Sequence, residues 1–122
     1  MKILMVNKFL FPKGGAETYM LRLGERLTEL GHQVEYFGMD DPARTVGNRW
    51  NLYTMPMDFH QCNAFQKATY LVRILYSREA RQKMYRLLTQ FQPDVILAPD
   101  PDVTSECHVD HLNVGNAAKQ VA

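Results

Sequence analysis

The chain has 122 residues, enough for one hydrophobic core, and its hydrophobic (46%) and charged (22%) fractions are those of a folded globular domain. A formal net charge of +1 and the lack of a long basic block give no support for nucleic acid binding. No apolar run approaches the roughly 18 residues that span a bilayer, and the apolar start is too short for a signal peptide, so we expect a cytoplasmic protein. Cys62 and Cys107 lie far apart and fit no metal-knuckle spacing, which predicts free thiols.

The first forty residues have the pattern of a βαβ unit. Residues 3–6 form a continuous apolar run, as expected of a strand covered on both faces, and a turn rich in Pro and Gly follows. Apolar residues recur at helical spacing over 16–30. Glu17 lies in the first turn, where it complements the helix dipole, and Gly31 is a natural C-terminal stop. Residues 34–38 then predict a second short strand.

The middle of the chain is predicted to be a long loop followed by helices and a strand. Residues 39–60 show no sustained period, and their aromatic side chains Trp50, Tyr53 and Phe59 are expected to order the loop. Helical patterns cover 64–76 and 77–91, the second with Ser77 as N-cap and Gln92-Pro93 as its break. Its predicted buried face comprises Ala80, Met84, Leu87, Leu88 and Phe91.

A last buried strand is predicted at residues 94–98. The whole order predicts an α/β fold: a Rossmann-like parallel sheet of at least three strands with helices on both faces.

The strongest candidate site is the turn from Lys13 through Gly14 and Gly15 to Glu17. Glycine lets the backbone approach a ligand closely, and the helix N-terminus behind it offers N–H groups and a partial positive charge that suit a phosphate. The turn matches neither G-x-G-x-x-G nor the Walker pattern. On the residues alone, a tight strand-to-helix turn without a ligand is an equally good interpretation.

Three parts of the sequence are distinctive: the opening M-K-I-L-M-V-N-K-F-L-F-P-K-G-G-A-E, the helix exit E-L-G-H-Q-V, and Y-S-R-E-A-R ahead of Q-P-D-V. Together they resemble family 4 glycosyltransferases of the GT-B architecture over about residues 1–96. In that family two Rossmann-like domains face each other across a cleft. The resemblance implies that residues 1–98 are the N-terminal, acceptor-side domain. It also implies that Gly14 and Gly15 line the cleft near the donor diphosphate, with Lys13 and Glu17 beside them.

The same resemblance implies a retaining glycosyltransferase without its donor-binding domain. The isolated chain is then expected to be inactive and to hold no cofactor, with a nucleotide-sugar donor bound only after completion by a C-terminal domain. Where the family usually carries histidine after the strand at 94–98, this sequence has Pro99 and Asp100.

The tail, residues 99–122, is similar to a motif of zinc-dependent N-acetylglucosaminyl deacetylases of the PIG-L/LmbE type, in A-P-D-P followed by H-V-D-H-L-N-V-G. The resemblance implies that His111 is a Zn²⁺ ligand and that His108 stabilises the oxyanion of amide hydrolysis. The early H-P-D-D segment of that family does not occur here. We therefore expect an incomplete zinc site and a junction near residues 93–98, with a drifted natural tail as the alternative.

Three functions stay open at this stage: a truncated glycosyltransferase, a fragment of a zinc deacetylase, and a non-catalytic binding module. The expected partner is a sugar or lipid-linked acceptor. The predicted helices are also basic, which favours either a peripheral contact with an anionic membrane or an ordinary solvated helix face. Their basic residues are Arg73, Arg78, Arg81, Lys83 and Arg86.

Overall fold

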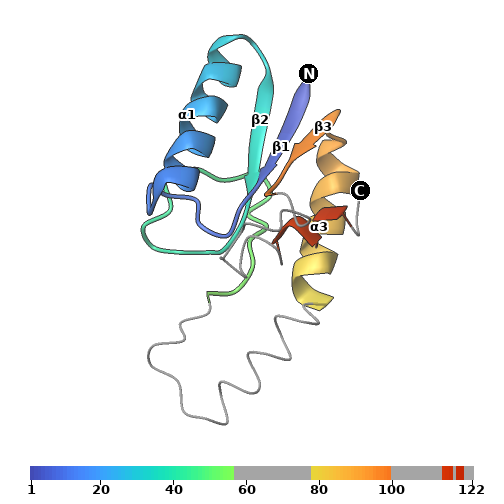
Figure 1. Ribbon diagram of the computed structural model, residues 1–122. Helices are drawn as coiled ribbons and strands as arrows, with labels where there is room; N and C mark the ends of the chain where they lie inside the picture. Colours follow the sequence, from blue (N-terminus) through green and yellow to red (C-terminus); the bar gives the residue numbers. More distant parts are fainter. Residues whose placement is uncertain (57–77, 100–113, 117, 120–122) are drawn as a thin grey trace.

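The computed structural model describes residues 1–56, 78–99, 114–116 and 118–119. The predicted helix at 64–76, its neighbour Ser77 and both cysteines lie outside these residues. The elements are β1 (Lys2–Val6), α1 (Gly15–Glu29), β2 (Gln33–Phe37), α3 (Arg78–Phe91) and β3 (Val95–Leu97). The strands form one parallel sheet in the order β2-β1-β3 (Figure 1). The α/β fold is therefore confirmed.

The central strand β1 supplies both cores of the domain. Its side chains alternate, so Ile3 and Met5 pack with Leu21 of α1, whereas Leu4 and Val6 pack on the other face. That second cluster contains Met84, Leu87 and Phe91 of α3. The two helices thus cover opposite faces of the sheet (Figure 1). The apolar run without polar alternation is explained, because β1 has no solvent face.

Helix α1 ends as its sequence predicts. Gly31 adopts a left-handed conformation with φ of 87°, which costs glycine little. Its N–H donates to the carbonyl of Thr28 (2.9 Å), and the N–H of His32 donates to the carbonyl of Leu27 (3.1 Å). These two bonds form a Schellman motif, which satisfies the last carbonyls of the helix and turns the chain into β2.

Helix α3 ends at the predicted break, and its end is attached to β1. Gln92 takes a left-handed conformation with φ of 50°, and its N–H donates to the carbonyl of Leu88 (2.8 Å). The ammonium of Lys2 donates to the carbonyl of Phe91 (3.1 Å), a favourable position for a cation at a helix C-terminus. The backbone N–H of Lys2 donates to a carboxylate oxygen of Asp94 (2.7 Å), so β3 starts in register beside β1.

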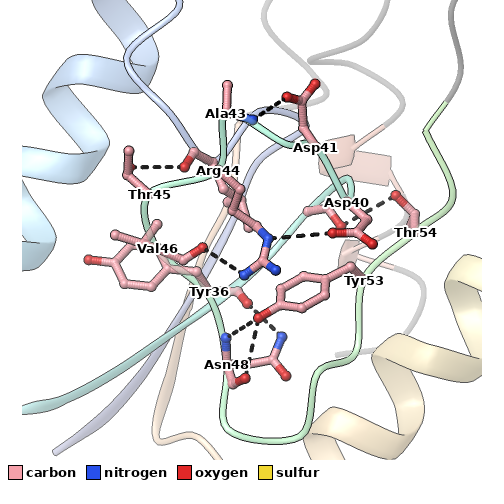
Figure 2. Close-up of polar contacts among 12 residues, drawn as sticks. Tyr36, Asp40, Asp41, Ala43, Arg44, Thr45, Val46, Asn48, Tyr53 and Thr54 are labelled. Atoms are coloured by element: carbon pink, nitrogen blue, oxygen red, sulfur yellow. Dashed lines mark hydrogen bonds and ion pairs between the residues drawn. The ribbon is translucent and has the colours of Figure 1, made fainter.

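The segment 39–56 covers the outer edge of β2. The N–H of Tyr36 donates to the carbonyl of Gly47 (3.2 Å), and the side-chain amide of Asn48 donates to the carbonyl of Tyr36 (2.9 Å) (Figure 2). The buried carboxylate of Glu35 accepts the guanidinium of Arg49 at 2.8 Å. An open strand edge, which is a site for unwanted pairing, is thereby closed.

Two of the three aromatic residues expected to order this segment do so. Tyr53 is buried, and its hydroxyl accepts the N–H of Asn48 at 2.9 Å (Figure 2). The guanidinium of Arg44 stacks over the Tyr53 ring at 3.9 Å from its centroid. The ring of Trp50 lies 5.9 Å from that of Phe91 and joins the segment to α3. Phe59 lies outside the described residues.

Candidate functional site

The candidate site lies at the carboxyl edge of the sheet. Because all strands are parallel, Val6, Phe37 and Leu97 end at the same edge. The chain runs from β1 to β2 on one side and reaches β3 on the other, so the reversal of strand order falls between β1 and β3. Ligands of open α/β sheets bind at such a point, outside the carboxyl ends. The turn at 7–14 and the start of α1 lie at this edge (Figure 1).

Asn7 fixes the direction in which the chain leaves β1. It is buried, its N–H donates to the carbonyl of Phe37 (3.1 Å), and its side-chain oxygen accepts the N–H of Lys8 (2.7 Å). The carbonyl of Lys8 in turn accepts the N–H of Met39 (2.9 Å). At Gly38 a Cβ would overlap the carbonyl oxygen of Asn7, so the two strand exits lie in direct contact.

Neither Asn7 nor Gly38 was predicted as part of the site. The available signal was a polar residue directly after a buried strand, matched by a glycine directly after the next strand. Their contact joins residues 31 positions apart, which no local pattern describes.

Gly14 and Gly15 differ in the space around them. Gly14 is the N-cap of α1 in an extended conformation, and its carbonyl accepts both the N–H (3.1 Å) and the hydroxyl (2.7 Å) of Thr18. A Cβ there would lie 3.0 Å from a carboxylate oxygen of Glu17, whereas a Cβ on Gly15 would meet nothing within 4 Å. The backbone at Gly15 is therefore open to a ligand, whereas the side chain of Glu17 limits the space at Gly14.

Lys13 belongs to a cluster of cations around one aromatic ring. Its ammonium lies 3.6 Å from the ring centroid of Phe9, and that of Lys8 lies at 5.0 Å from the same centroid. The ring of Phe11 meets Phe9 edge to face at 5.5 Å. Two positive charges thus stand on the turn just before the N-terminus of α1, where the helix dipole has the same sign.

Glu17 lies in the first turn of α1, as predicted, and is buried. Its carboxylate stands behind Gly14 and favours the helix start through the dipole. The same negative charge lowers the attraction of the N-terminus of α1 for an anion. The positive potential of the turn therefore comes from the ammonium groups of Lys8 and Lys13.

Comparison with known families identifies the chain. Residues 13–112, most of the chain, match the family model described as Glycosyltransferase Family 4. The chain belongs to glycosyltransferase family 4. The match begins at Lys13, the first residue of the glycine turn, and confirms the family 4 resemblance. No curated protein and no solved structure matches the chain.

The histidines of the tail lie outside the described residues of this family 4 chain. The family match extends over His108 and His111, and the deacetylase resemblance stays a prediction. In the described segments 1–56, 78–99, 114–116 and 118–119, no group of three or more His, Cys, Asp or Glu side chains is placed to hold a metal ion. The same segments contain no helix that is long and apolar enough to cross a membrane.

Proposed function

We propose that residues 1–98 form the acceptor-side domain of a retaining glycosyltransferase that uses a nucleotide-sugar donor. The proposal is supported chiefly by the open backbone at Gly15, located at the carboxyl edge of the sheet within a family 4 chain. The donor nucleotide would be held by a C-terminal domain facing this edge. Under the proposal residues 1–98 hold no cofactor of their own, and sugar transfer requires both domains of the cleft.

The turn at 13–17 would act on the leaving group. During transfer the bond between the anomeric carbon and a diphosphate oxygen breaks and negative charge grows on the diphosphate. The oxygen of the acceptor hydroxyl bonds to the anomeric carbon, and its proton passes to the departing diphosphate. The first N–H groups of α1 receive no bond from an N-cap side chain, because the N-cap is Gly14. Together with the ammonium of Lys13 they are suited to stabilise that charge.

The acceptor would lie between the same edge and the second domain. We propose a sugar or a lipid-linked sugar as the acceptor and a cytoplasmic location with a peripheral membrane contact. The proposal is consistent with a described structure that contains no membrane-spanning helix.

A calorimetric titration of the chain with nucleoside diphosphate sugars tests the diphosphate contact, which by itself should give only weak binding. Gly15→Val is the sharpest variant, because nothing lies within 4 Å of a Cβ there and the fold should tolerate it. We expect at least tenfold weaker binding, about 1.4 kcal/mol. Gly14→Val adds a contact with Glu17 and therefore also needs a stability measurement.

A charge variant and its matched control complete the test. Lys13→Met should weaken binding severalfold, whereas Arg26→Met removes the same charge at the far end of α1 and should not. Binding by Gly15→Val as tight as that of the unchanged chain would refute the diphosphate contact.

Zinc titration tests the second proposal, that the tail is a fragment of a zinc deacetylase. Stoichiometric Zn²⁺ binding that is lost in His111→Ala, and changed little in His108→Ala, would support it, since only His111 is a proposed ligand. A chain that binds neither zinc nor nucleotide-sugar would fit the third function, a non-catalytic binding module.

A further inference from the structure

The ring of Phe9 is held in place at the carboxyl edge of the sheet. It lies in the turn that follows β1, and the residues on both sides of it are bonded to the chain after β2. The carbonyl of Lys8 accepts the N–H of Met39 at 2.9 Å. The carbonyl of the buried Leu10 accepts both the N–H (2.9 Å) and the hydroxyl (3.2 Å) of Thr45. The backbone on either side of Phe9 is therefore fixed.

One face of this ring is covered by an ammonium group and not by the core. Phe9 is half-buried, and the ammonium of the exposed Lys13 lies 3.6 Å from its ring centroid. The ring of Phe11 meets Phe9 edge to face at 5.5 Å and steadies it. The face of an aromatic ring carries negative charge density, which attracts the ammonium. Because an exposed lysine covers this face, the face opens to solvent once the ammonium leaves.

The contact of Lys13 with the ring is weak enough to be exchanged. A cation over an aromatic ring near the surface gains less than a charge-assisted hydrogen bond to a phosphate oxygen provides. Lys13 directly precedes Gly14, the N-cap of α1, and its flexible stem can bring the ammonium to the N-terminus of the helix. A diphosphate bound at that N-terminus would draw the ammonium off the ring. The same event would uncover Phe9.

An uncovered aromatic ring at this position suits one face of a sugar. Several C–H groups lie together on one face of a pyranose, and the negative face of an aromatic ring attracts their weak positive charge. The turn that carries Phe9 lies at the carboxyl edge of the sheet, directly before the start of α1 (Figure 1). A sugar stacked on the ring would therefore lie close to a diphosphate at the helix N-terminus, as transfer to that sugar requires.

We propose that Phe9 is the stacking platform for the acceptor sugar, and that Lys13 covers it until the donor diphosphate draws the ammonium away. The inference rests on the proposed function, because it takes the diphosphate at the start of α1 as given and adds the acceptor contact. The two binding events then depend on each other. A diphosphate should raise the affinity for a sugar, and by linkage the sugar should raise the affinity for the diphosphate by the same factor.

Nuclear magnetic resonance of the chain with labelled lysine tests the movement of Lys13. The ring current of Phe9 should shift the ε protons of Lys13 to low frequency, and saturating inorganic pyrophosphate should return them to the ordinary position of lysine. Lys2 is the internal control, because its ammonium lies 5.9 Å from the ring of Phe91 at the other end of β1 and should not respond. A shifted amide of Gly15 with unmoved Lys13 protons would overturn the cover and leave the diphosphate contact intact. No change at either position would refute both.

Saturation-transfer spectra with methyl β-glucoside and methyl β-galactoside as probes test the platform. In the unchanged chain we expect contact with the sugar C–H protons only when pyrophosphate is present, whereas Lys13→Ala should show it without pyrophosphate. Phe9→Leu keeps the apolar bulk and should lose most of the signal, and Phe9→Tyr, which keeps the ring, should retain it. Circular dichroism should show that all three variants are folded. Equal signals in Phe9→Leu and the unchanged chain, or no sugar contact in Lys13→Ala, would each overturn the assignment of Phe9.

Discussion

The hydroxyl oxygen of Tyr36 on β2 lies directly against the backbone of Gly24 on α1, so that a Cβ at position 24 would overlap it. The sulfur of Met5 on β1 lies 3.2 Å from the same point. Helix and sheet therefore approach each other closely at a position where the helix has no side chain. This contact sets the distance of α1 from the sheet and with it the position of the turn that precedes the helix.

Gly24→Ala should destabilise the chain. In an exposed helix the change stabilises by about 1 kcal/mol, but here the Tyr36 ring must shift, at a cost of about 1–3 kcal/mol. Because Met5 also limits the space, we expect a net loss in the free energy of unfolding, measured by urea denaturation. Adding Tyr36→Phe removes the overlapping oxygen and should restore part of it. Gly15→Ala is the open-space control, and a more stable Gly24→Ala would contradict the close approach.

The stability of the chain should fall in alkaline solution through Tyr36. Burial raises the pKa of its phenol, and the negative charge of Glu25 adds to the increase. The folded state then keeps a proton that the unfolded state begins to lose near pH 10. The contribution of the neutral phenol is therefore complete below about pH 10 and decreases as the pH rises further. Urea midpoints over this range should fall less in Tyr36→Phe, and parallel curves for both chains would refute the assignment.

Asn48→Ala should be among the more damaging changes in the segment 39–56. The buried side-chain amide donates to the carbonyls of Tyr36 and Leu52, both at 2.9 Å, and its oxygen accepts the N–H of Leu52 at 3.1 Å. Loss of these bonds removes a partner from the buried carbonyl of Tyr36 and from the half-buried backbone groups of Leu52, which costs about 1–3 kcal/mol. The matched control is Asn51→Gly, at an exposed residue with φ of 56°, where glycine should be neutral. Equal stability of both variants would contradict this account.

Gly38→Ala should disturb the edge that forms the candidate site. The added methyl would overlap the carbonyl oxygen of Asn7, which is backbone and moves only with the strand, and would crowd the side chain of Leu10. We expect a loss of about 3 kcal/mol in the free energy of unfolding. Hydrogen exchange at the amides of Asn7 and Met39, which bond across this contact, should become faster. Unchanged exchange at both amides would show that the strand exits do not depend on Gly38.

Much of this fold could be predicted from the sequence, because the informative patterns are local. The apolar run 3–6 predicted a strand buried on both faces, and helical spacing predicted the buried face of α3. Gly31 marked the end of α1, because only a left-handed residue closes a Schellman motif cheaply. The glycine turn could be located for the same reason, since it joins consecutive elements.

Only the tertiary structure decided which distant residues meet. The order β2-β1-β3 brings the exits of β1 and β2 together at Asn7 and Gly38. The segment 39–56, predicted only as an aromatic-ordered loop, completes the edge of β2 through the ion pair of the buried Glu35 with the exposed Arg49. Periodicity records whether a residue faces a core, but it carries no information about which neighbour it will have. That choice depends on space and hydrogen-bond partners, which exist only once the chain has folded.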